Sequence, residues 1–129
     1  MTVIDHLSVG VTDIKSACAF YDPVLETVSV NRLAANDGFA AYGKGRVEFI
    51  AILPFNAETA TGGNGTHICF AAPSPEAVDA FHAAALRNGG SDEGAPGPRG
   101  AYPIPDVYTA YVRDPFGNKL EVIHNGFSR

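Results

Sequence analysis

The sequence predicts an α+β fold built from two successive βαβββ modules. A histidine opens a short apolar strand at His6 and again at His67, and each is followed by a phenylalanine 14 positions later and a leucine 19 positions later. Each half also closes on an apolar strand that carries a glutamate, Glu48 or Glu121. Because the features repeat in the same order, the chain is expected to be a duplicated unit.

The first module begins with a strand over residues 3–11, where apolar and polar residues alternate. Thr12 and Asp13 then offer a helix N-cap, and apolar residues recur at helical spacing as far as Leu25. Three shorter β-like segments are expected to complete the module, near 28–33, 37–42 and 46–53.

The second module follows a linker over residues 57–64. A strand over 66–72 leads to a helix at Ser74-Pro75-Glu76, where a capping serine, a proline at the first helical position and an early acid combine. Further strands are expected near 91–95, 107–112 and 119–124, the last two joined by a turn over residues 114–118. The chain is therefore expected to be one domain, 1–129, with modules of about 1–56 and 65–125.

Length and composition limit the classes of function. At 129 residues the chain can bury a core as one domain. A net charge of −5 without a basic stripe argues against nucleic acid. We expect no membrane span and no signal peptide, since no apolar run approaches about 18 residues. Two cysteines are too few for a disulfide framework and fit a reducing cytoplasm.

Strand parity places four polar side chains on one face: His6, Glu48, His67 and Glu121. Their apolar neighbours have the opposite parity and are expected to pack under the helices, which leaves these four on the open face. Imidazoles and carboxylates are donors that Zn, Ni, Mn and Fe accept, so the set predicts a divalent-metal site. The alternative is four ordinary polar groups at strand edges or in a solvated groove.

Five more residues are candidates for contact with a substrate: Cys69, Arg99, Tyr102, Tyr108 and Tyr111. Cys69 shares the strand face of His67, although a small buried thiol would look the same. Arg99 and Tyr102 lie in a Pro/Gly-rich loop, 96–106, of the kind that forms lids or specificity elements. Arg99 could anchor an anionic group. The two later tyrosines face either substrate or core.

The same residues make the chain resemble the vicinal-oxygen-chelate superfamily, which includes glyoxalase I, fosfomycin-resistance thiol transferases, bleomycin-binding proteins and extradiol dioxygenases. The resemblance rests on residues 5–9, 65–68 and 112–121 and runs over essentially the whole chain. It implies a U-shaped, mostly antiparallel eight-stranded sheet that forms a cup, commonly in a homodimer with modules contributed by both chains. The resemblance also implies that the family's metal positions fall on His6, Glu48, His67 and Glu121.

The resemblance implies a lyase or isomerase in which a divalent metal chelates vicinal oxygens of a small substrate and Glu121 or Glu48 moves a proton. An alternative is a metal-free protein that sequesters a small aromatic or antibiotic ligand. A third is an Fe(II) dioxygenase using His6, His67 and Glu121, although such enzymes usually carry twice as many modules. One scaffold hosts several chemistries, so the sequence selects no substrate.

Overall fold

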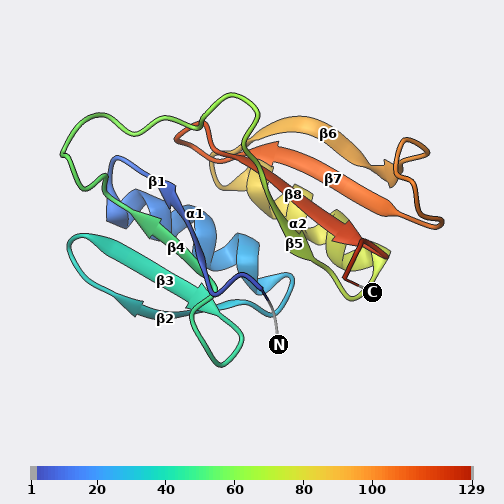
Figure 1. Ribbon diagram of the computed structural model, residues 1–129, viewed down its shortest axis with the longest axis horizontal. Coiled ribbons are helices and arrows are strands. Elements are labelled where there is room, and N and C mark those ends of the chain that lie inside the picture. Colours follow the sequence, from blue (N-terminus) through green and yellow to red (C-terminus); the bar gives the residue numbers. More distant parts are fainter. Residues whose placement is uncertain (1–2, 129) are drawn as a thin grey trace.

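The computed structural model describes residues 3–128. Each half of the described chain has the predicted βαβββ order, and the α+β fold class is confirmed (Figure 1). The elements are β1 (Leu7–Gly10), α1 (Ile14–Glu26), β2 (Asn31–Ala35), β3 (Phe39–Gly43), β4 (Phe49–Ile52), β5 (Ile68–Ala71), α2 (Pro75–Arg87), β6 (Ser91–Pro98), β7 (Tyr108–Arg113) and β8 (Lys119–His124).

The strands form two four-stranded sheets with matching order, β1-β4-β3-β2 and β5-β8-β7-β6. In each sheet the first strand of the module pairs in parallel with the last, and the other pairs are antiparallel. Figure 1 shows α1 behind the first sheet and α2 behind the second, so each sheet has one covered face and one open face. No helix in residues 3–128 is long and apolar enough to cross a membrane.

Local signals account for both helices. The side chain of Asp13 accepts from the Ser16 amide at 2.7 Å and caps α1, and Ser74 caps α2 through the Ala77 amide at 3.2 Å. The buried faces of the two helices contribute to one hydrophobic core that both modules share. Phe49 of β4 and Phe70 of β5 meet edge to face within it, with ring centroids 5.2 Å apart.

Strand ends differ from the sequence-based boundaries where the backbone turns. The first strand begins at Leu7 and β4 begins at Phe49, so His6 and Glu48 lie just outside the strands that they precede. β6 extends to Pro98 but is irregular, with register shifts on both sides of Gly94. β6 contains Pro96 and Pro98, which have no amide hydrogen to donate to a neighbouring strand. Because β6 is the edge strand of its sheet, such breaks in the hydrogen-bond ladder are tolerated.

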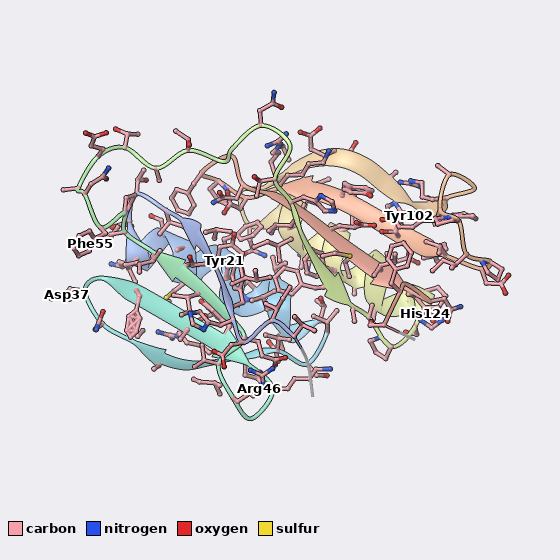
Figure 2. All side chains as sticks on the ribbon, in the orientation of Figure 1. Tyr21, Asp37, Arg46, Phe55, Tyr102 and His124 are labelled. Carbon is pink, nitrogen blue, oxygen red and sulfur yellow. The ribbon has the colours of Figure 1, made fainter. Side chains whose placement is uncertain are left out.

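A buried turn between β7 and β8 ties the two modules together. Asp114 is 4% exposed, and its Oδ1 accepts from the amides of Phe116 and Asn118, each at 2.8 Å. Its Oδ2 accepts from the Tyr21 hydroxyl of α1 at 2.5 Å. The Asn118 amide group also donates to the Gly10 carbonyl at 2.8 Å. Tyr21 lies where the two modules meet (Figure 2), so this turn acts as a clasp between them.

Candidate functional site

Glu121 is the centre of a polar cluster on the second sheet. β8 places it opposite Tyr111 of β7 and Cys69 of β5, and the residue is only 1% exposed. Its Oε1 lies 3.1 Å from Nε2 of His67. Its Oε2 accepts from the Tyr102 hydroxyl at 2.5 Å and from the Thr109 hydroxyl at 2.6 Å. We call these six residues the Glu121 cluster: His67, Cys69, Tyr102, Thr109, Tyr111 and Glu121.

Strand period and one loop assemble this cluster. Along β7, Thr109 and Tyr111 alternate with Ala110 and Val112, which belong to the core. Tyr102 comes from the loop before β7, and its hydroxyl lies 3.1 Å from the Tyr111 hydroxyl. The cluster therefore draws on three strands and one loop of the same module.

The cluster shifts the protonation of its members. Burial raises the pKa of Glu121, but hydrogen bonds from Thr109, Tyr102, Tyr111 and Cys69 outweigh it, so the pKa lies below the usual value. Burial, then the charge of Glu121, raises the pKa of the Cys69 thiol, although Cys69 as a whole residue is exposed on an edge strand. The thiol is therefore protonated at neutral pH and is a poor nucleophile.

The lowered pKa of Glu121 predicts an acid-sensitive part of the folding free energy. The folded pKa lies below the ordinary 4.5, so the carboxylate stabilises the fold above about pH 4.5 and loses this effect as the pH falls through the folded pKa. In urea titrations from about pH 7 to pH 3, Glu121→Gln is expected to lose stability less steeply than the wild type. The other carboxylates are common to both proteins and cancel. Equal slopes would contradict the assignment.

The first module places His6 and Glu48 apart from this cluster. Nδ1 of His6 lies 2.6 Å from Oδ1 of Asp5, and Glu48 accepts from the Lys44 amide at 3.0 Å and lies 3.9 Å from Arg46. Within residues 3–128, no three His, Cys, Asp or Glu side chains are grouped so as to hold a metal ion. One chain thus joins His67 to Glu121 but leaves the other two candidates beside the first sheet, next to the strands that they precede.

The glutamates of the two modules are not in equivalent positions. Ser8 and Cys69 each lie two residues after the first histidine of their module. Cys69 pairs with Glu121 across the parallel ladder, whereas Ser8 pairs with Ile50. Ile50 is therefore the counterpart of Glu121, and Glu48 precedes that position by two residues. The correspondence between Glu48 and Glu121 expected from the order of elements is wrong by this shift.

The other candidates divide between the cluster and the rest of the surface. Tyr102 and Tyr111 lie in the cluster. The Arg99 guanidinium donates to the carbonyls of Ala95 at 2.7 Å and Pro98 at 3.2 Å, both in the preceding strand β6. The Tyr108 hydroxyl donates to Asp79 of α2 at 2.7 Å, on the helix side of the sheet. Thr109 was missed by sequence reasoning, although its parity with Tyr111 was a usable signal.

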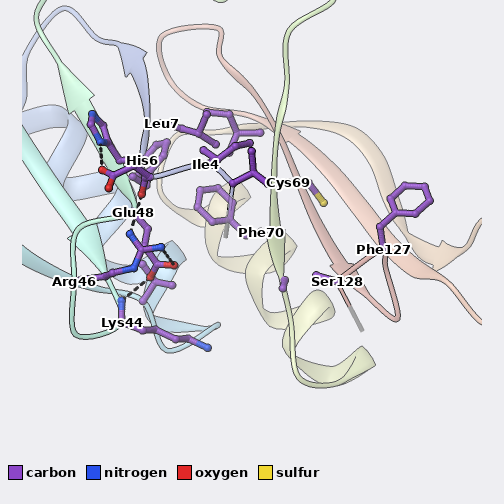
Figure 3. A pocket seen from close by; sticks show the side chains of 16 residues that line it. Ile4, His6, Leu7, Lys44, Arg46, Glu48, Cys69, Phe70, Phe127 and Ser128 are labelled. Atoms are coloured by element: carbon purple, nitrogen blue, oxygen red, sulfur yellow. Dashed lines mark hydrogen bonds and ion pairs between the residues drawn. The ribbon is translucent and has the colours of Figure 1, made fainter. Parts of the chain in front are cut away.

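A largely apolar groove of about 1000 Å³ runs between the residues that precede β1 and those of β5 (Figure 3). Leu7, Phe70 and Phe127 are among its apolar lining residues. Figure 3 shows His6 and Glu48 on one side of the groove and Cys69 on the other. Cys69 is thus shared by the groove and the Glu121 cluster.

A divalent metal fits the Glu121 cluster only in part. His67 and Glu121 offer an imidazole and an ionised carboxylate with donor atoms 3.1 Å apart, and both are suitable ligands. A metal site needs at least three protein donors as a rule, and the described part of one chain does not group three. Residues 3–128 of one chain therefore supply two of the donors and not a complete metal site.

Comparison with known proteins agrees with this fold. The model of the Glyoxalase/Bleomycin resistance protein/Dioxygenase superfamily matches residues 3–122. The chain is similar to a solved glyoxalase/bleomycin resistance protein from Albidiferax ferrireducens T118, with 40% identity, a TM-score of 0.86, and coverage of 97% of this chain and 100% of that one. No match was found among curated proteins.

More distant structures share the fold. A glyoxalase-related enzyme from Fulvimarina pelagi is 14% identical, with a TM-score of 0.74 and coverage of 97% of this chain and 89% of that one. A glyoxalase/bleomycin resistance protein/dioxygenase family enzyme from Burkholderia phytofirmans PsJN is 20% identical, with a TM-score of 0.72 and coverage of 92% and 95%. The family model matches nearly the whole chain, residues 3–122, so the chain belongs to the glyoxalase/bleomycin resistance protein/dioxygenase superfamily.

Proposed function

We propose that this protein is a lyase or isomerase of small molecules whose divalent-metal site is completed in a homodimer. One subunit would supply His67 and Glu121, and the partner subunit's His6 would supply the third donor. The observation that carries the proposal is the pair itself: an ionised, buried carboxylate with one oxygen held by hydroxyls and the other 3.1 Å from an imidazole. Membership of the superfamily supports the same class of chemistry.

The proposed ligand set has three members and leaves out Glu48. Glu48 lies two residues from the position that matches Glu121, and that position holds Ile50. Glu48 is also occupied by the Lys44 amide and by Arg46. Two histidines and one carboxylate leave coordination positions open, as a site that binds two neighbouring substrate oxygens requires.

The residues of the chain have separate tasks in this proposal. When bound, a divalent cation supplies Lewis acidity toward the substrate oxygens. Glu121 could accept a proton at Oε1, the oxygen that neither Tyr102 nor Thr109 occupies, only while that oxygen is not bound to the cation. Cys69 pairs with Glu121 in the sheet and also lines the apolar groove, which could hold the apolar part of a substrate. A cytoplasmic location fits the two free cysteines.

A mixed dimer tests both the metal and its position between subunits. His6→Ala and Glu121→Gln chains, co-expressed with two different tags, give a dimer in which one subunit keeps His6 and the other keeps Glu121. If the site is shared, one site stays complete, and elemental analysis should find about half the wild-type metal content. If each site lies within one chain, the mixed dimer should hold none.

In a matched control, each subunit loses one of the two ligands, His67 or Glu121, that one subunit would supply to a site. A mixed dimer of His67→Ala and Glu121→Gln chains has no complete site under either arrangement, so it should bind no metal. A wild-type protein that contains no metal, and that shows no thermal shift with Ni²⁺, Zn²⁺, Mn²⁺ or Fe²⁺, would overturn the proposal. It would favour a metal-free binding protein, a second candidate that the apolar groove supports.

A further inference from the structure

Tyr102 donates a hydrogen bond to Oε2 of Glu121, an oxygen that also accepts from Thr109. Thr109 also reaches Oε2 of Glu121, at 2.6 Å, but its hydroxyl lies 2.7 Å from the Val122 carbonyl as well. A threonine hydroxyl has a single hydrogen, which these two acceptors must share. The Tyr102 hydroxyl, 2.5 Å from Oε2, has Glu121 as its one acceptor apart from the Tyr111 hydroxyl, which can itself donate.

The position of Tyr102 is fixed from several sides. Its amide donates to the Arg99 carbonyl at 3.3 Å, and Arg99 in turn donates to two carbonyls of β6. Its ring lies against Phe127 near the C-terminus, with centroids 5.8 Å apart. A phenol held by its backbone, its ring and its hydroxyl is pre-organised to orient the carboxylate that it contacts.

We propose that Tyr102 is a positioning residue that holds Oε2 of Glu121, so that Oε1 alone faces His67 and the open side of the sheet. Glu121 would then bind a cation through one oxygen rather than two. This keeps a coordination position free for substrate. The expected effect on metal coordination rests on the function proposed above. The contact between Tyr102 and Glu121 does not depend on a metal.

Removal of the hydroxyl alone tests the proposal with two measurements. In metal-free protein, the separation between the two carboxylate stretching bands of Glu121, identified by subtracting the infrared spectrum of Glu121→Gln, is expected to narrow in Tyr102→Phe because the two oxygens become more alike. With Co²⁺ bound, Tyr102→Phe would leave Oε2 with only the shared hydroxyl of Thr109, so this oxygen is expected to reach the metal. The higher coordination number should lower the visible Co²⁺ absorption about twofold or more.

Tyr108→Phe is the matched control, since Tyr108 lies on the other face of the same sheet with Asp79 as its partner. It should change neither measurement. Phe127→Ala removes the ring contact with Tyr102, and Phe127 is an exposed residue. This variant should narrow the separation between the two infrared bands more weakly. It replaces Tyr102→Phe as the test if that variant fails to fold. Unchanged bands in both variants would overturn the role of Tyr102. Narrowed bands with no Co²⁺ bound by any protein would support that role and overturn the proposed metal function.

Discussion

Asp114→Ala is expected to lower the free energy of unfolding by about 3–5 kcal/mol. The carboxylate is buried and accepts four hydrogen bonds, from the Tyr21 hydroxyl, the Asn118 side chain and the amides of Phe116 and Asn118. Alanine would leave these donors buried without an acceptor, and each unsatisfied donor costs about 1–3 kcal/mol before the structure relaxes. Urea denaturation followed by circular dichroism measures the loss.

Two further variants show whether the clasp between modules causes this loss. Tyr21→Phe removes only the bond from α1 to Asp114 and should cost about 1–3 kcal/mol. Asp92→Ala removes an exposed aspartate that pairs with His82 and accepts from the Gly94 amide, and it should cost much less stability than Asp114→Ala. If Asp114→Ala were no more destabilising than Asp92→Ala, the turn would not be a significant link between the modules.

The features that the sequence predicted well are local ones. Both helices begin at the residues whose side chains cap them, Asp13 and Ser74, and the repeated βαβββ order follows from alternation and turn residues near in sequence. Residues 114–118 were expected to form a turn, and they do. Their second role, the contact with Tyr21, joins positions 93 residues apart and leaves no mark on local patterns.

The candidate site was predictable only as far as strand parity reaches. Parity has a period of two, so it puts Glu48, Ile50 and Glu121 on open faces alike. A shift of two residues in register keeps every side chain on its face and is invisible to this rule. The turn before β4 introduces such a shift, and only the pairing of Ser8 with Ile50 reveals it.

Parity also says nothing about how one sheet sits against another. Parity could place His6 and His67 on open faces. It could not show that they lie beside two different sheets, each just before the first strand of its module. Tyr102 lies in a loop without periodicity, so the sequence could suggest it as a candidate but could not predict its contact with Glu121. The parts of the site that depend on contacts between distant segments are therefore set by tertiary packing, which the sequence pattern does not record.

The register shift leads to the sharpest expectation at the site itself. Glu121→Gln is expected to weaken binding of a divalent cation by about 100-fold or more, because it removes the proposed charged ligand and the buried acceptor around which the cluster is built. Glu48→Gln makes the same chemical change in the first module, where the carboxylate contacts Lys44 and Arg46. It should leave the affinity within about twofold. Competition with a chromophoric chelator measures both.

Ile50→Glu tests the same register from the opposite direction. It places a carboxylate at the position of the first module that matches Glu121. A fourth donor should tighten metal binding by about tenfold, since it adds a charged ligand to a set of three. The same variant should fill a coordination position that the substrate needs, so turnover should fall while affinity for the metal rises. If Glu48→Gln weakened binding as strongly as Glu121→Gln, Glu48 would be a ligand, and the three-donor set would be wrong.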